Sequence, residues 1–179
     1  MRTLAEIRSL APRQVETIRK DVNENTAEVL KLLKGVRKEK WDKRPEQGKW
    51  SAMEVMEHIV KMEYGVSQIM DGDLQRIGRD PLQKVAFFRA SFADQDRNFV
   101  APAATLPAGE FMSVADSASK FEKMRTKFLA KAEERGWEEL CFTYKHYAFG
   151  QLTVAEWLLL CVAHTDRHIR QIKHALATS

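Results

Sequence analysis

The feature that most constrains the fold of this chain is a helical repeat of apolar residues. In four long segments, apolar side chains recur every three or four positions with polar side chains between them, which is typical of helices with one buried face. These segments run from about 13 to 37, from just after 51 to about 70, from about 113 to 136, and from just after 153 to the C-terminus. The pattern therefore predicts an all-α fold, a four-helix bundle.

The connections between these segments indicate how the bundle is arranged. The connection between the second and third segments, 77–112, is long. It contains a short helix that we expect to open at Pro81, and an uncharged run, 98–109, that we expect to lie over the bundle surface. A long crossover between helices 2 and 3 favours a non-meander topology. Segment 141–147 could be extended, but it stands alone without a partner strand. No linker or repeat divides the chain, so we expect a single domain over residues 1–179.

Composition narrows the class of protein and its surroundings. An apolar fraction of 44% is enough for a sizeable core, and a net charge of +4 does not by itself indicate an acidic partner. The longest stretches free of charge and proline, such as 157–165, are much shorter than the roughly 20 residues of a membrane helix. Charges at Arg2, Glu6 and Arg8 are unlike a signal peptide, and two cysteines cannot form a disulfide framework. We therefore expect a soluble, cytoplasmic protein.

Two helix starts carry the same capping signal. Ser51 is followed three residues later by Glu54, and Thr153 is followed three residues later by Glu156. In such a capping box the hydroxyl accepts a hydrogen bond from the third helical amide, and the carboxylate accepts one from the amide of the cap residue. The two boxes are structural, and they set the start and the rotational phase of the second and fourth helices.

The phase of these two helices places three histidines on apolar faces. His58 lies on the apolar face of the second helix, and His164 and His168, four residues apart, share one face of the fourth. The three imidazoles can therefore point into one volume inside the bundle. A divalent metal would satisfy them with three nitrogen ligands and leave a fourth position open, and such a site favours zinc, nickel, copper or iron over magnesium or calcium. Three hydrogen-bonded core histidines without a metal are the alternative that spacing alone leaves open.

The motifs around these histidines match a known family. The stretch 45–59, which contains Lys49-Trp50-Ser51-Ala52 and ends His58-Ile59, resembles the first signature of the DinB-like superfamily. The stretch 149–157, followed by His164-Thr165-Asp166-Arg167-His168, is similar to its second. The resemblance implies an up-down-down-up bundle that often forms a homodimer. It also implies a divalent metal, zinc or nickel, held by three histidines that correspond to His58, His164 and His168.

The resemblance points to an enzyme without selecting one reaction. Its characterised members include bacillithiol S-transferases, mycothiol-dependent maleylpyruvate isomerase and proteins described as metal-dependent hydrolases. For this chain it implies thiol transfer or hydrolysis of a small-molecule substrate, with a low-molecular-weight thiol as a further cofactor in the first case. The alternative is a stress-related binding or interaction bundle that catalyses nothing and holds a structural metal or none. No further motif separates these possibilities.

Several other residues are candidates for supporting roles. His146, just before the fourth helix, could reach the mouth of the pocket as a proton shuttle, because the ordinary pKa of histidine is near neutrality. Cys161, one turn before His164, could be a fourth ligand or a reactive thiolate, although a small buried apolar residue is the commoner role. His174 is expected on the surface. Candidates to accept a hydrogen bond from a ligating imidazole are Glu57, Glu63 and Asp166.

The basic segment 31–49 offers a possible site for nucleic acid, but its context favours a simpler explanation. It lies at a helix C-terminus and in the loop that follows, where the helix dipole favours Lys and Arg. A nucleic-acid site would want such a patch next to a recognition element or stacking aromatic residues, whereas this one falls on a helix end and a loop. We therefore expect a solvated surface, and neither a nucleic acid nor a membrane as a partner.

Overall fold

A computed structural model describes residues 9–178, apart from 77, 95, 98 and 111–112. The charged residues at the extreme N-terminus, both ends of the predicted domain, and the predicted limits 77, 98 and 112 of the crossover and its uncharged run lie outside the described residues. Four long helices form an all-α bundle, as the apolar repeat predicts: α1 Pro12–Leu33, α3 Ala52–Asp71, α5 Val114–Arg135 and α6 Val154–Thr178.

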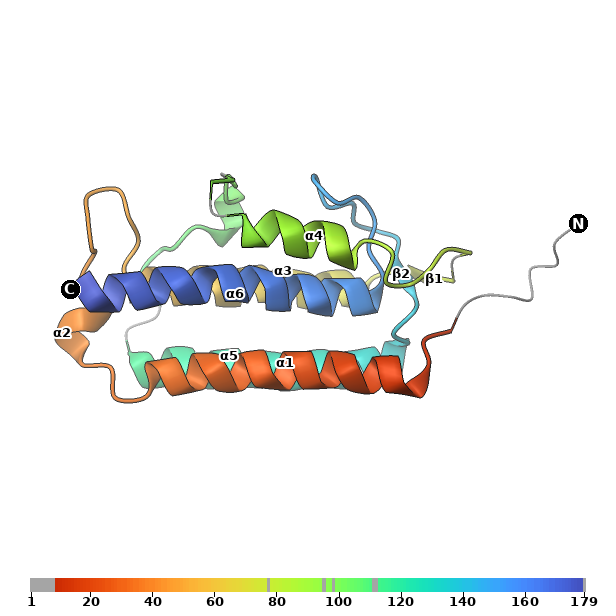
Figure 1. Ribbon diagram of the computed structural model, residues 1–179, viewed down its shortest axis with the longest axis horizontal. Helices are drawn as coiled ribbons and strands as arrows, with labels where there is room; N and C mark the ends of the chain where they lie inside the picture. Colours follow the sequence, from red (N-terminus) through yellow and green to blue (C-terminus); the bar gives the residue numbers. More distant parts are fainter. Residues whose placement is uncertain (1–8, 77, 95, 98, 111–112, 179) are drawn as a thin grey trace, which may run out of the picture.

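The four helices are arranged up-down-down-up (Figure 1). Around the bundle, α1 packs beside α6, α6 beside α3, α3 beside α5, and α5 beside α1. As a result α3 and α6, which are separated by residues 72–153, are antiparallel neighbours. Residues of the second and fourth long helices can therefore meet in one site.

Short helices and strands lie between the four long helices in the sequence. The helix α4 packs along α6, and its Arg89 also pairs with Asp21 of α1 at 2.6 Å. The single turn η1 contacts α3 (Figure 1). Two short strands pair antiparallel near the start of α6. The bounds of these elements are α2 Lys38–Trp41, β1 Leu74–Gln75, α4 Val85–Ala93, η1 Ala103–Thr105 and β2 Leu140–Cys141.

Large aromatic and aliphatic side chains fill the interior. Trp157 on α6, Phe88 on α4 and Phe121 and Phe128 on α5 are all at most 2% exposed. Full burial of such a side chain stabilises the fold by about 1.5–3 kcal/mol. Because α6 contributes buried residues toward α1, α3 and α4, it is the central helix of the protein.

Both predicted capping boxes are confirmed. Ser51 Oγ accepts from the amide of Glu54 at 3.2 Å, and Glu54 Oε2 accepts from the amide of Ser51 at 2.8 Å. At the start of α6 the corresponding distances between Thr153 and Glu156 are 3.1 and 3.0 Å. The starts of α3 and α6, and so the directions of their side chains, are fixed locally by these contacts.

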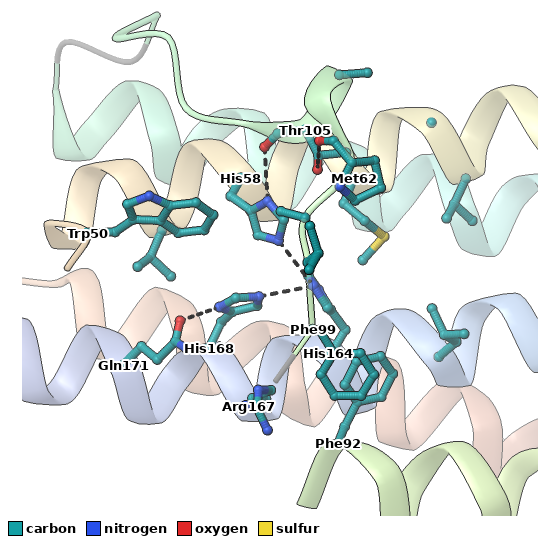
Figure 2. A pocket seen from close by; sticks show the side chains of 18 of the residues that line it. Trp50, His58, Met62, Phe92, Phe99, Thr105, His164, Arg167, His168 and Gln171 are labelled. Carbon is teal, nitrogen blue, oxygen red and sulfur yellow. Dashed lines mark hydrogen bonds between the residues drawn. The ribbon is translucent and has the colours of Figure 1, made fainter. Parts of the chain in front are cut away.

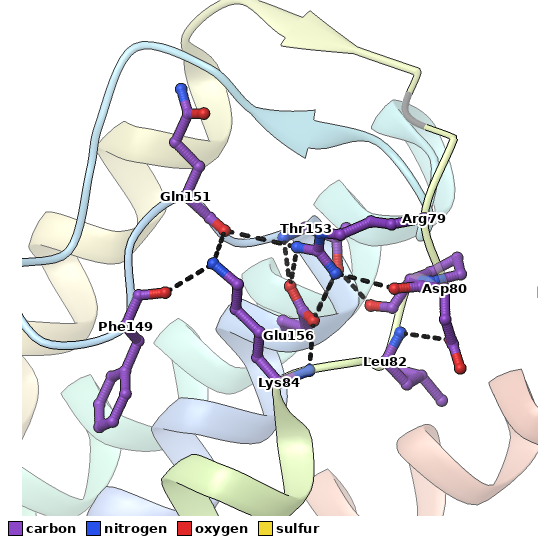
Figure 3. Close-up of polar contacts among 9 residues, drawn as sticks. Arg79, Asp80, Leu82, Lys84, Phe149, Gln151, Thr153 and Glu156 are labelled. Carbon is purple, nitrogen blue, oxygen red and sulfur yellow. Dashed lines mark hydrogen bonds and ion pairs between the residues drawn. The ribbon is translucent and has the colours of Figure 1, made fainter.

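The carboxylate of Glu156 does more than cap its helix (Figure 3). It also accepts from the guanidinium of Arg79 at 2.6 and 2.8 Å and from the amide of Lys84 at 2.9 Å. The ammonium of Lys84 then donates to the carbonyls of Phe149 and Gln151 at 2.6 and 2.8 Å. One buried carboxylate therefore ties the segment before α4 to the segment before α6.

This tie corrects the predicted start of the short helix. The sequence places its opening at Pro81, whereas α4 begins at Val85 and residues 81–84 form a turn. The turn persists because the amides of Leu82 and Lys84 donate to the carboxylates of Asp80 and Glu156.

Two other expectations are wrong at their edges. The first helix ends at Leu33 and not near residue 37, because Gly35 adopts a φ of +79°, which breaks the helical path. Segment 141–147 is not without a partner. Its first residue, Cys141, lies in β2, which pairs with β1 in the register Leu74 to Cys141. The sequence does not reveal β1, because two residues are too few to show an alternation of apolar and polar side chains.

Candidate metal centre

The structure brings the side chains of His58, His164 and His168 together between α3 and α6. Figure 2 shows the three rings pointing toward one another from the two facing helices. The Nε2 atom of His164 lies 3.2 Å from Nε2 of His58 and 3.0 Å from Nε2 of His168. All three residues offer a ligand atom within 4.8 Å of the others. The antiparallel packing of α3 on α6 produces this convergence, since each ring lies on the helix face that meets the other helix.

The outer nitrogens of two of these rings are held by acceptors. His58 Nδ1 donates to the carbonyl of Thr105 at 2.9 Å, and His168 Nδ1 donates to Oε1 of Gln171 at 2.6 Å (Figure 2). Because a carbonyl oxygen only accepts, both Nδ1 atoms carry the proton, and both Nε2 atoms present a lone pair toward His164.

Burial keeps the three imidazoles neutral. It lowers the pKa of His58, and it lowers the pKa of His168 to about 3, with the neighbouring His58 as the next cause. The pKa of His164 also lies well below its usual value, first through burial and then through the other two histidines. Neutral imidazole is the form that binds a metal, so the protonation state suits ligation.

The donor set fits one divalent metal. Three nitrogens at about 2.0–2.1 Å from a tetrahedral ion lie about 3.3 Å from each other, close to the two Nε2 separations of 3.0 and 3.2 Å. Without an ion, Nε2 of His164 lies between the unprotonated Nε2 atoms of His58 and His168, and it can donate a hydrogen bond to only one of them. A cation at the shared point would satisfy all three nitrogens at once. That these residues hold a metal stays a prediction.

The three histidines lie in the wall of a large cavity open to solvent, with a volume of about 890 Å³. Its lining comes from α3, α6, the segment before α3, the crossover and the loop before α6. A structural metal site is closed by protein ligands, whereas a catalytic site keeps one position accessible. The cavity therefore provides room for a small molecule beside the three nitrogens.

The crossover reaches the centre because α3 holds it in place. The carboxylate of Glu57, fully buried, accepts from the amides of Ala108 and Gly109 at 2.6 and 2.9 Å. Lys61, one turn further, donates to the carbonyl of Leu106 at 3.2 Å. These contacts fix the segment from which Thr105 reaches His58. The uncharged run therefore lies over the bundle as predicted, and it also supplies a contact to the site.

The three carboxylates expected to support the ligands do not contact them. Glu57 binds the crossover, Glu63 pairs with Arg125 at 2.6 Å, and Asp166 accepts from Asn25 at 2.6 Å. The acceptors are instead Thr105 and Gln171. Gln171 lies three residues after His168 on the same helix, a spacing that sequence reasoning could have used. Thr105 acts through its backbone, which carries no signal in the sequence.

The remaining candidates fall into three different settings. Cys161 is fully buried, and burial raises the pKa of its thiol far above the usual value, as expected of a small core residue and not of a thiolate. His146 lines the cavity, but its Nδ1 accepts from the amides of Ala148 and Phe149, and burial lowers its pKa to about 4. It is therefore neutral at pH 7, with its proton on Nε2. His174 is exposed at the cavity rim.

Fold and site together define the class as a helical bundle whose facing helices bring three histidines into an open cavity. Comparison with known proteins makes the family definite: the model of the DinB superfamily matches residues 22–172, and the chain belongs to that superfamily. It is 28% identical over 153 residues to the uncharacterized protein YuaE of Bacillus subtilis strain 168, covering 84% of this chain and 92% of YuaE.

A solved structure shares the fold. The structure of YfiT from Bacillus subtilis, described as a "probable metal-dependent hydrolase with an unusual four-helix bundle topology", aligns with a TM-score of 0.58. The alignment covers 94% of this chain and 89% of YfiT at 13% sequence identity. Among the helices of the described residues, none has the length and apolar character to cross a membrane.

Proposed function

We propose that this protein is a metal-dependent enzyme that hydrolyses a small molecule. His58, His164 and His168 would hold one divalent ion, zinc or nickel, and the substrate would enter the adjoining cavity. The observation that carries the proposal is the convergence of three neutral imidazole nitrogens in the wall of an open cavity. Membership of the DinB superfamily and the fold shared with YfiT support it.

The residues of the chain have distinct tasks in such a reaction. A divalent ion with an open coordination position lowers the pKa of bound water or of a bound thiol, which supplies a nucleophile near neutral pH. Thr105 and Gln171 hold the rings of His58 and His168 in the orientation that presents Nε2. The apolar cavity wall excludes water from the rest of the substrate.

Thiol transfer would use the same three ligands, so an experiment is needed to distinguish it from hydrolysis. Purified protein should be assayed against a panel of ester and amide substrates, with and without bacillithiol, mycothiol, glutathione and coenzyme A. Turnover without any thiol supports hydrolysis, and turnover that requires one thiol assigns transfer. No turnover in either panel, together with a metal that does not exchange, supports the non-catalytic interaction bundle.

Metal content tests the site itself. The unmodified protein should bind one ion per chain, and the double variant His164→Ala/His168→Ala should bind none. His174→Ala is the matched control, because His174 is an exposed histidine of the same helix outside the cluster. Full metal occupancy in the double variant would remove the proposed centre.

A further inference from the structure

The residues that line the cavity differ in polarity on the two sides of the three histidines. Along α6, the cavity residues before His164 are apolar, Trp157 and Leu160, whereas those after it include Arg167 and Arg170. Arg170 lies at the edge of this face, and it also lines a second, smaller pocket together with Glu28 and Asp166. The metal centre therefore lies at a boundary between an apolar part and a charged part.

The facing helix α3 contributes uncharged residues to the cavity. After His58 these are Met62, Gly65, Val66 and Ile69. Since α3 and α6 run antiparallel, these residues lie opposite the apolar part of α6. Trp157 lies seven positions before His164, so the apolar arm extends roughly 10 Å from the centre, at 1.5 Å of helix rise per residue.

Arg167 carries a charge that protein carboxylates do not neutralise by contact. Its guanidinium donates to the carbonyls of Asp94 and Arg97 and lies over the ring of Phe99, 5.4 Å from the centroid. No carboxylate lies within 4.0 Å of it in the part of the chain that the structure describes, and the side chain of Asp94 acts on it from outside the cavity lining.

Arg167 is also close to the centre through a short chain of ring contacts. Phe99 stacks on Phe92 with centroids 4.9 Å apart, and Phe92 meets the ring of His164 edge-on at 5.6 Å. Figure 2 shows Arg167 on the same side of the three imidazoles as Phe92.

The charges around this part of the cavity are mostly positive. Among the described residues, Arg167, Arg170 and Lys49 line it against the carboxylate of Glu46. Arg170 also acts on the carboxylate of Asp166, which lies outside this cavity. Glu46 is exposed and lies 3.7 Å from His174 at the rim, so it does not contact either arginine. The excess of positive lining residues favours an anion in this part of the cavity.

We propose that the substrate is an amphipathic anion, with its apolar body in the arm between α3 and α6 and its anionic group at Arg167 and Arg170. This inference rests on the proposed function, because it places the reacting bond at the three histidines, between the two ends of the substrate. A planar guanidinium pairs well with a carboxylate or a phosphate, and the free hydrogen-bonding capacity of both arginines is available for it.

Three probes that share one body test the charge preference: 4-phenylbutyrate, 4-phenylbutanol and 4-phenylbutylamine. Their binding is measured by titration calorimetry and by the fluorescence of Trp50 and Trp157, which line the cavity, in metal-free and in zinc-loaded protein. We expect the carboxylate to bind at least tenfold more tightly than the alcohol or the amine in both forms. Acetate, which lacks the apolar body, should bind at least tenfold more weakly than phenylbutyrate.

Arg167→Gln and Arg170→Gln should each weaken the binding of phenylbutyrate at least fivefold and leave the binding of phenylbutanol unchanged. Arg13→Gln, an exposed arginine of α1 outside the cavity, is the matched control. Arg170→Gln is a second test in case the Arg167 variant misfolds, because the side chain of Arg170 makes a single hydrogen bond to the described residues, at 3.2 Å to the carbonyl of Phe92.

Equal binding of the three phenyl probes, or no binding of any, overturns the proposal. A carboxylate preference that occurs only with zinc and survives both arginine substitutions also overturns it, while leaving the metal centre intact. Metal content is measured on the same samples. A protein that binds no metal but keeps the arginine-dependent preference contradicts the proposed function and not the anion site.

Discussion

Replacement of Gln171 is a direct test of how the protein tunes its metal ligands. Oε1 of Gln171 accepts from Nδ1 of His168 at 2.6 Å, and His168 is only 6% exposed. Gln171→Leu leaves that N–H without its acceptor at a nearly dry position. Loss of such a partner lowers metal affinity about 10–100-fold, or about 1.4–2.7 kcal/mol. Gln171→Glu replaces the amide by a stronger acceptor, so metal affinity should rise.

The assay is competition for zinc against a chelator of known affinity, with unfolding measured in parallel. Because Gln171→Leu leaves a buried N–H unpaired, it should lower the free energy of unfolding of the metal-free protein by about 1–3 kcal/mol. Gln171→Glu keeps an acceptor at an exposed position and should change that free energy by no more than about 0.5 kcal/mol. Gln83→Leu makes the same change at an exposed position outside the cavity and should leave zinc affinity unaltered. If both Gln171 variants bind zinc as tightly as the unmodified protein, the tuning argument is refuted.

Four further predictions follow from other features. Arg125→Met leaves Glu63 buried without its partner, so the free energy of unfolding measured in urea should fall by about 3–5 kcal/mol. An unchanged free energy of unfolding would mean that Glu63 takes up a proton at no cost. His146 has a folded-state pKa of about 4 against an unfolded value near 6.5, so the unfolded state binds the extra proton. Its contribution to stability is therefore present above pH 6.5 and falls as pH drops toward 4, a slope that should be shallower in His146→Leu. Gly136→Ala should lower the free energy of unfolding by about 1–2 kcal/mol, because Gly136 has a φ of +94°, which is strained for a residue with a Cβ atom. Thermal or urea unfolding measures the change. The expected homodimer should sediment at twice the chain mass of 20.6 kDa, and a species of 20.6 kDa at micromolar concentration would contradict it.

The parts of the fold that sequence predicts are those set by local rules. The starts of α3 and α6 follow from capping boxes, in which the interacting groups lie three residues apart. Once the starts are fixed, the helical period fixes which face each histidine occupies. His58, His164 and His168 could therefore be selected before any contact between α3 and α6 was known.

The parts that sequence does not predict depend on contacts between distant segments. The acceptor for His58 is a backbone carbonyl at Thr105, and any residue type could supply it. The sequence offers Glu57 and Asp166 as candidate acceptors for the histidines, but their partners lie on the crossover and on α1. A long-range partner of a carboxylate is chosen by packing, which no local pattern records.

The hydrogen bond from Thr105 to His58 has a consequence for how the centre opens. His164 and His168 belong to the central helix, whose amide hydrogens should exchange with solvent only through global opening. Thr105 belongs instead to a short turn between irregular stretches, which can detach without unfolding the bundle. Amide exchange at residues 103–106 should therefore be much faster than in α6, and it should slow when zinc orders the ring that Thr105 holds. Ion uptake and release would then be governed by a local fluctuation of one turn, independent of the stability of the whole domain.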